Sequence, residues 1–162
     1  MSNTSRVAIA LGSNLGDREA HLAFAVRRLS AAFTGLHVSS SYETVPVGAS
    51  GPQPLFLNAA AVGETTMTAA QTLEYLLNTE QQRGRERSRP GAARTLDLDL
   101  VLFGDAVIGE PSLTVPHPRF RDRLFVLEPL AEIAPDLRDP VTGATVHQLL
   151  ARLQAAPPPR HR

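Results

Sequence analysis

Asp97 and Asp99 are two carboxylates separated by a single leucine, inside the otherwise apolar run Arg94–Phe103 (R-T-L-D-L-D-L-V-L-F). If this run is a β-strand, alternate side chains point to opposite faces, so both aspartates share one face and Leu98 points to the other. Two neighbouring negative charges destabilise each other unless a cation lies between them. Carboxylate oxygens are also ligands that a divalent cation prefers. The pair therefore indicates either a metal site or the solvated face of an amphipathic strand.

Arginines precede this strand in a segment whose glycines and proline favour a loop. The segment holds Arg83, Gly84, Arg85, Arg87, Arg89, Pro90, Gly91 and Arg94. A guanidinium presents a planar fork of donors that suits phosphate oxygens. Together with the carboxylates, the loop suits a magnesium polyphosphate. A solvated basic loop and a nucleic-acid patch are the alternatives, although no aromatic residue lies among these arginines to stack on bases.

Composition limits the class of protein. The 162 residues, 43% of them hydrophobic, are enough for one domain with a core, expected over residues 1–154, and the proline-rich tail 155–162 is expected to be disordered. Sixteen basic and 16 acidic residues balance, so no overall charge directs the chain to nucleic acid or to an anionic membrane. There is no cysteine, and no apolar run approaches about 18 residues. We expect a monomeric cytoplasmic protein.

Hydrophobic periodicity and turn residues predict the elements that must position these side chains. Strands are predicted over residues 6–11, 36–44, 56–65, about 95–103 and 106–108, with a turn at 12–14 and extended chain over 111–118. Helices are predicted after the caps Asp17 and Thr68, ending near Phe33–Gly35 and Arg83–Gly84, and over 125–133 and 145–153. The order of the core elements is strand, helix, strand, strand, helix, strand.

That order predicts an α+β fold, a ferredoxin-like α/β sandwich in which helices cover one face of an antiparallel sheet and a C-terminal region is appended. Two long loops, over residues 46–54 and 86–93, flank the aspartates and are expected to move over the site.

Several separated blocks of the sequence carry a resemblance to the 6-hydroxymethyl-7,8-dihydropterin pyrophosphokinases. The blocks are A-L-G-S-N-L-G-D (10–17), S-S-Y-E-T-V-P-V-G (40–48), F-L-N (56–58), G-R-E-R (84–87), R-T-L-D-L-D-L (94–100), V-P-H-P-R (115–119) and R-L-F-V-L-E-P-L (123–130). The resemblance implies an enzyme of folate biosynthesis that transfers pyrophosphate from ATP to the pterin alcohol and releases AMP. The chain departs from the family's commonest pattern at R-P-G-A-A-R (89–94), Ser112 and Pro118, on the adenine side.

The resemblance also implies a role for each matching residue. Asp97 and Asp99 would hold two Mg²⁺ ions between ATP and the pterin, and would form the catalytic set with Arg85 and Arg94. The implied pterin-binding residues are Thr44, Val45, Pro46, Val47, Phe56, Asn58 and Phe125, with the two phenylalanines on the ring faces and Asn58 and Thr44 at the ring edge. The implied ATP-binding residues are Glu80, Arg85, Arg87, Arg89, Arg94, Thr114, His117 and Arg123.

The residues by themselves leave other interpretations open. Phe56 and Phe125 could be ordinary core residues, and His117 a surface histidine, whereas Asn58 would need polar partners if buried. For the whole chain, the alternatives are a module that senses a small anion without catalysis and a nucleic-acid-binding domain.

Overall fold

The computed structural model of the chain describes residues 3–45, 54–84 and 95–156. Its strands are β1 (Ser5–Ser13), β2 (Thr34–Val38), β3 (Tyr42–Thr44), β4 (Phe56–Thr65), β5 (Asp97–Phe103), β6 (Ile108–Glu110) and β7 (Leu113–Val115). Its helices are α1 (Arg18–Ala32), α2 (Ala69–Gln82), α3 (Leu124–Ile133) and α4 (Val146–Ala155), with a 3₁₀ turn at Phe120–Asp122. No helix in these ranges is long and apolar enough to span a membrane.

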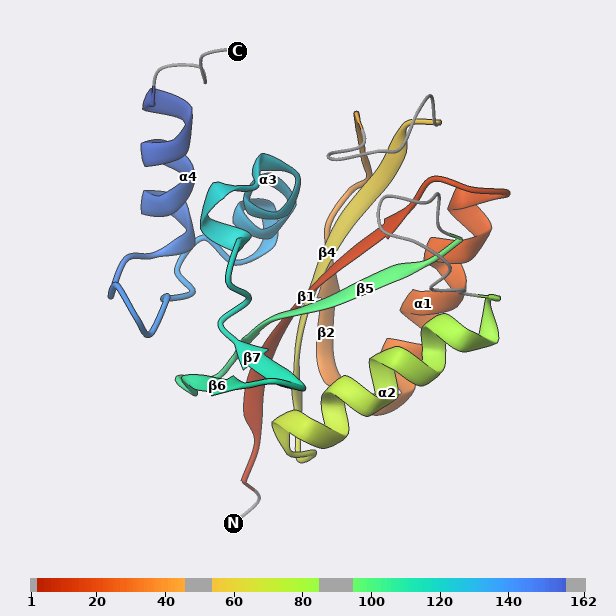
Figure 1. Cartoon of the computed structure of the whole chain (residues 1–162), viewed down its shortest axis with the longest axis horizontal. Helices are drawn as coiled ribbons and strands as arrows, with labels where there is room; N and C mark the ends of the chain where they lie inside the picture. Colours follow the sequence, from red (N-terminus) through yellow and green to blue (C-terminus); the bar gives the residue numbers. More distant parts are fainter. Residues whose placement is uncertain (1–2, 46–53, 85–94, 157–162) are drawn as a thin grey trace.

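The main sheet has the order β2-β4-β1-β5, with β3 also paired to β4, and each neighbouring pair is antiparallel (Figure 1). Strands β6 and β7 form a separate two-stranded sheet. The predicted ferredoxin-like α+β sandwich is therefore confirmed.

Helices pack on both faces of the sheet, where the sequence had predicted cover on one face (Figure 1). Odd-numbered residues of β1, such as Ile9 and Leu11, join the core under α1 and α2. Ala8 and Ala10 join a second core with residues of α3 and α4. A strand that is buried on both faces has a continuous apolar run, as A-A-A-V is in β4, and does not alternate between apolar and polar residues. Such a run does not by itself show that both faces are covered.

Three predicted helix starts are confirmed by their caps. The side chain of Asp17 accepts a hydrogen bond from the Ala20 amide at 3.0 Å. Thr68 and Thr145 each form a capping box with the glutamine three residues later. Such side chains satisfy amide groups that have no partner within the helix, and each cap stabilises its helix by about 1 kcal/mol.

Several predicted boundaries were wrong. The turn expected at residues 12–14 begins later, because Gly12 and Ser13 continue β1. The segment 36–44 forms two strands, since the Ser39 side chain accepts the hydrogen bond of the Ala60 amide where a continuous strand would have used its backbone. The short strand expected at 106–108 is Ile108–Glu110, and its partner β7 lies in the segment predicted as plain extended chain.

Candidate active site

The two aspartates of β5 lie on the face of the sheet that α3 covers in part. Leu96, Leu98 and Leu100 are 0%, 3% and 5% exposed and belong to the core under α1 and α2. Asp97 and Asp99 alternate with them and are only partly buried. The predicted alternation of this strand is confirmed.

A row of four residues crosses the sheet at the level of Asp97. Tyr42 pairs with Asn58, Asn58 with Gly12, and Gly12 with Asp97. Paired residues of antiparallel strands point to the same face, and adjacent strands lie about 4.8 Å apart. Asn58 and Asp97 are therefore about 10 Å apart, on either side of a glycine.

Neighbouring side chains approach the backbone of Gly12 closely at the centre of this row. A Cβ atom at this position would lie 3.2 Å from Asn58 Oδ1, closer than most real contacts, and 3.4 Å from Phe56 Cδ1, at van der Waals contact. The aromatic ring and the amide therefore converge directly above the glycine backbone. Sequence reasoning placed Gly12 in a turn and missed it, although a glycine within an apolar strand is itself a signal of close approach.

Asn58 is 5% exposed, and its amide has the polar partner that burial requires. Its Nδ2 donates to Thr44 Oγ1 on β3, and Thr44 pairs in register with Phe56. Three of the residues predicted to bind a pterin thus form one group, and Val45 follows them with 73% exposure.

His117 and Asp97 interact electrostatically at the other side of the row. The pKa of His117 is lowered by burial first and then by the guanidiniums of Arg123 and Arg119, while Asp97 acts in the opposite direction. The Nδ1 atom accepts from the Arg119 amide at 3.1 Å, so the neutral ring carries its proton on Nε2. The His117 amide in turn donates to the carbonyl of Val101 at 2.9 Å, which fixes the residue against β5.

Arg123 and Phe125 lie at the start of α3. Arg123 is the N-cap residue, and its guanidinium lies 5.4 Å from the centre of the Phe125 ring. Phe125 packs at the margin of the second core and is only partly buried. The structure thus brings an aromatic ring and a cation to the helix terminus that borders the site.

Glu80 lies beneath the acidic strand. It is 2% exposed, and its Oε2 accepts from the amide of Leu98, the residue between the two aspartates, at 2.7 Å. Its predicted contact with ATP stays a prediction. Thr114 is exposed on β7, where its hydroxyl donates to the carbonyl of Glu110 at 3.3 Å.

Six of the predicted site residues lie outside the described part of the chain. They are Pro46, Val47, Arg85, Arg87, Arg89 and Arg94. The predicted mobile loops 46–54 and 86–93 also fall almost wholly in these gaps.

The two carboxylates of β5 suit a magnesium ion that also takes ligands from substrate and water. They are too few for a metal ion coordinated by protein side chains alone. Within residues 3–45, 54–84 and 95–156, no three His, Asp or Glu side chains gather into a metal-binding group. Mg²⁺ is commonly bound through one or two carboxylates, with substrate phosphates and water as the other ligands. Two carboxylates on one face of a strand match that requirement.

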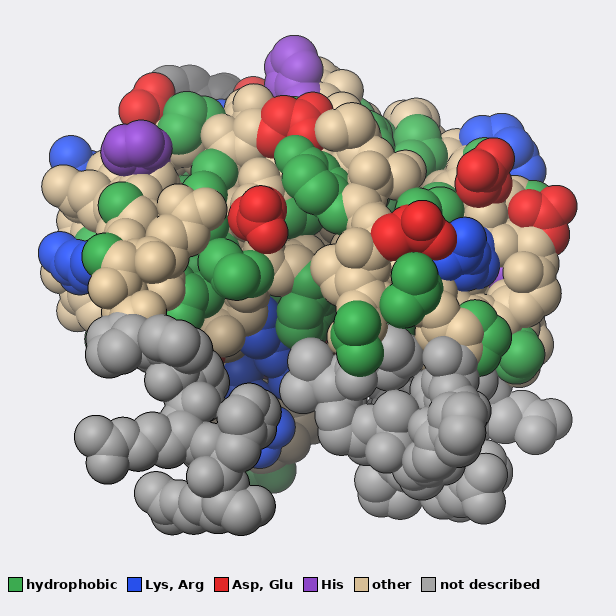
Figure 2. All heavy atoms as spheres, turned by 90° about the horizontal axis from the view of Figure 1, so that it is seen from above, with side chains coloured by type: hydrophobic (Ala, Val, Ile, Leu, Met, Phe, Trp, Pro, Cys, Tyr) green, Lys and Arg blue, Asp and Glu red, His purple; other side chains and the backbone are tan. Residues whose placement is uncertain are grey.

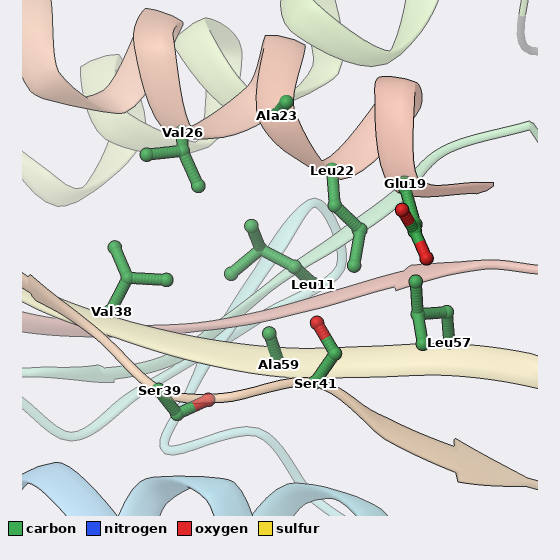
Figure 3. A pocket seen from close by; sticks show the side chains of 10 residues that line it. All are labelled: Leu11, Glu19, Leu22, Ala23, Val26, Val38, Ser39, Ser41, Leu57 and Ala59. Carbon is green, nitrogen blue, oxygen red and sulfur yellow. The ribbon is translucent and has the colours of Figure 1, made fainter. Parts of the chain in front are cut away.

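The opposite face of the sheet contains a separate cavity of about 290 Å³. Figure 3 shows it between α1 and the strands, lined by residues such as Leu11, Leu57 and Val26. Leu11 and Leu57 are the chain neighbours of Gly12 and Asn58, so the sheet itself separates this cavity from the candidate site.

Charge is mixed on the surface seen from above. Figure 2 shows basic side chains grouped in a hollow low on this face, while acidic and hydrophobic side chains are scattered among the other coloured residues. A nucleic-acid interface would be expected to show a continuous basic stripe, so this coloured surface gives that alternative no support.

One family of known proteins is similar to this chain in sequence. The sequence model of the family described as 7,8-dihydro-6-hydroxymethylpterin-pyrophosphokinase (HPPK) matches residues 8–135. The 2-amino-4-hydroxy-6-hydroxymethyldihydropteridine pyrophosphokinase of Bacillus subtilis (strain 168) is 46% identical over 142 residues, covering 86% of this chain and 84% of that protein. The protein of the same name from Methylorubrum extorquens is 43% identical and covers 92% of this chain and 94% of its own length.

Among solved structures, a Plasmodium falciparum HPPK-DHPS triple mutant with SDX-DHP superposes with a TM-score of 0.75 at 15% identity. The match covers 93% of this chain but only 44% of that chain. At this identity the likeness supports the fold alone.

Proposed function

The chain belongs to the 7,8-dihydro-6-hydroxymethylpterin-pyrophosphokinase family, and from that membership we propose how its residues carry out the reaction. The enzyme transfers the pyrophosphoryl group of ATP to 6-hydroxymethyl-7,8-dihydropterin in folate synthesis. The pterin hydroxyl attacks the β-phosphorus and AMP leaves. Such a transfer needs positioning and stabilisation of charge more than covalent participation of the protein.

Asp97 and Asp99 would hold Mg²⁺, and we propose that they hold two ions. Their position on one face of β5, facing away from the apolar core, supports this role. Bound magnesium would neutralise negative charge on the phosphates and on the attacking and leaving oxygens. Glu80 supports the aspartates by fixing the backbone between them through the Leu98 amide.

The pterin lies over Gly12, between the rings of Phe56 and Phe125. A flat heterocycle needs aromatic faces and a few polar groups aimed at its edge. The amide of Asn58 and the hydroxyl of Thr44 are hydrogen-bonded to each other and supply such groups. The close approach of Asn58 and Phe56 to Gly12 supports this assignment, because a larger residue at position 12 would displace these two groups.

His117 and Arg123 bind phosphate oxygens of ATP from the side of Asp97. His117 is held by its amide and its Nδ1 atom, which leaves the Nε2 proton to donate. Its lowered pKa keeps the ring neutral near pH 7, so it contributes a hydrogen bond and no charge. Arg85, Arg87, Arg89 and Arg94 are proposed as further phosphate ligands, and Thr114 as a contact on the nucleotide side. Action as a monomer and location in the cytoplasm stay predictions.

The experiment that tests this function measures AMP release from ATP with magnesium and 6-hydroxymethyl-7,8-dihydropterin. The wild type should form AMP in proportion to the pterin consumed, and formation of ADP would reject pyrophosphoryl transfer. Asp97→Asn should reduce turnover by about 10³-fold or more while the melting temperature stays near that of the wild type, because its defect is in metal binding. Asp105→Asn is the matched control, since Asp105 is exposed in the turn after the same strand. If Asp97→Asn retained activity, the metal assignment would be wrong.

A further inference from the structure

Glu132, in the last turn of α3, accepts three hydrogen bonds from the segment that leads into β3. Its Oε2 accepts from the Ser40 amide at 2.9 Å. Its Oε1 accepts from the Ser40 hydroxyl at 2.5 Å and from the Tyr42 hydroxyl at 2.6 Å. These hydrogen bonds, those of the Ser40 side chain first, lower the pKa of Glu132, so the carboxylate is the form that the contact stabilises.

The two elements joined by Glu132 carry opposite sides of the proposed pterin site. Phe125 lies two helical turns before Glu132 on α3, which is about 10 Å along the axis. Tyr42 pairs with Asn58, and Thr44 follows on the same face of β3. The carboxylate therefore connects the helix that presents one aromatic ring to the strand that presents the polar edge groups.

Polar contacts help to hold the β3 side of this connection, including the ion pair of Glu43 with Arg18 at 2.9 Å. Strand β3 has only three residues, and β4 is its partner in the sheet. The residues before it, Ser39 and Ser41, line the cavity of about 290 Å³ on the other face, and Figure 3 shows the Ser41 side chain pointing into that space. A segment backed by empty volume can shift unless polar contacts hold it, and Glu132 supplies three from the opposite side.

We propose that Glu132 is a positioning residue for the pterin, which holds α3 against β3 so that Phe125 and the Thr44–Asn58 pair keep the separation a flat ring requires. The inference rests on the proposed function. Glu132 contacts no reacting atom. Its effect should appear in the affinity for the pterin before it appears in the affinity for ATP, because the groups it aligns are those assigned to the pterin.

The test compares Glu132→Ala, Glu132→Gln and the wild type by steady-state AMP release. Glu132→Ala removes both acceptor oxygens, and with them all three hydrogen bonds. It should raise the KM for the pterin about tenfold, since a displacement of about 1 Å at a site can cost up to 10²-fold. The KM for ATP should stay within about twofold. The KM of Glu132→Gln for the pterin should lie between those of Glu132→Ala and the wild type. The glutamine Oε1 can accept from the Ser40 amide, and its NH₂ group can donate to the two hydroxyls, which can rotate to accept.

Two further variants make the test specific. Glu128→Gln removes the same charge one turn earlier on α3. It should match the wild type, because Glu128 acts on Tyr42 through its charge, with no hydrogen bond between the two among the described residues. Tyr42→Phe removes one of the three donors, and combined with Glu132→Gln it should show clear non-additivity in the KM for the pterin, as expected for groups that act together.

A melting temperature that falls in Glu132→Ala and Glu132→Gln while both KM values stay unchanged would overturn the inference, since the contact would then be only structural. Equal increases in the two KM values would also overturn it. If Glu132→Ala does not fold, Glu132→Gln and Tyr42→Phe decide by the same criteria. Failure of the wild type to release AMP would instead reject the proposed function itself.

Discussion

Replacing Asp139 with asparagine should destabilise the enzyme by an amount that depends on pH. Asp139 is fully buried between α3 and α4 and accepts from Arg121 Nε at 2.5 Å and Arg121 Nη2 at 2.8 Å. The Thr142 hydroxyl and the Val141 amide also donate to it. Burial raises the pKa of this carboxyl, but the hydrogen bonds from Arg121, Thr142 and Val141 outweigh burial and lower the pKa from 3.8 to about 2.

The pKa gives the size of the effect. A fall in pKa from 3.8 to about 2, at about 1.4 kcal/mol for each pKa unit, corresponds to about 2.5 kcal/mol of folding stability from ionised Asp139. This contribution is complete above the unfolded pKa of 3.8 and is lost as the pH falls through about 2. At pH 3, midway through that window, about half of it should remain. For a chain of this size, a loss of about 2.5 kcal/mol is a decrease of roughly 5–10 °C in melting temperature.

The assay is urea denaturation of the wild type and Asp139→Asn at several pH values between 7 and 3. Asp136→Asn, an exposed change three residues earlier, is the control and should stay within about 0.5 kcal/mol of the wild type. The reasoning is refuted if Asp139→Asn costs less than about 0.5 kcal/mol at pH 7. It is also refuted if the difference from the wild type does not shrink between pH 5 and pH 3.

Three further changes test other parts of the structure. Gly12→Ala should raise the KM for the pterin about tenfold, because the added methyl group would lie 3.2 Å from Asn58 Oδ1. The melting temperature should change little. An unchanged KM in steady-state assays would contradict the proposed position of the pterin ring. Thr44→Val removes the hydroxyl that accepts from the Asn58 amide, and the loss of one hydrogen bond should raise the KM for the pterin about 5- to 10-fold. Steady-state assays at varied pterin concentration would check this. The pKa of His21 is lowered by burial and then by Arg83, whose Nε donates to His21 Nδ1 at 2.9 Å. Neutral His21 therefore stabilises the fold. This stabilisation is complete above pH 6.5, the ordinary pKa of histidine, and is lost as the pH falls below it. In His21→Gln this loss of stability should be absent, so the melting temperature should fall less than that of the wild type between pH 7.5 and pH 5. Equal slopes of melting temperature against pH in the two proteins would contradict the assignment.

The placement of the two aspartates was readable from the chain. Asp97 and Asp99 could be placed on one face because a strand repeats every two residues, and the leucines between them marked the buried side. The caps at Asp17 and Thr68 could be predicted because they depend on contacts within three residues. The family motifs supplied the reaction, since they identify residues by type and spacing.

Other features depend on groups that are distant in the sequence. The role of Gly12 follows from the neighbouring strands, which bring Asn58 and Phe56 over it. The contact of Glu132 with Ser40 and Tyr42 joins residues about 90 positions apart. Neither partner carries a local signal of this contact.

The sequence by itself determined the kinds of side chain available for binding phosphate, metal and pterin, because periodicity and local hydrogen bonds are properties of short segments. Only the tertiary structure decided that α3 packs on the second face of the sheet, and that Glu132 of this helix accepts hydrogen bonds from Ser40 and Tyr42. Register between strands and packing between layers set those positions, and both arise from contacts across the whole chain.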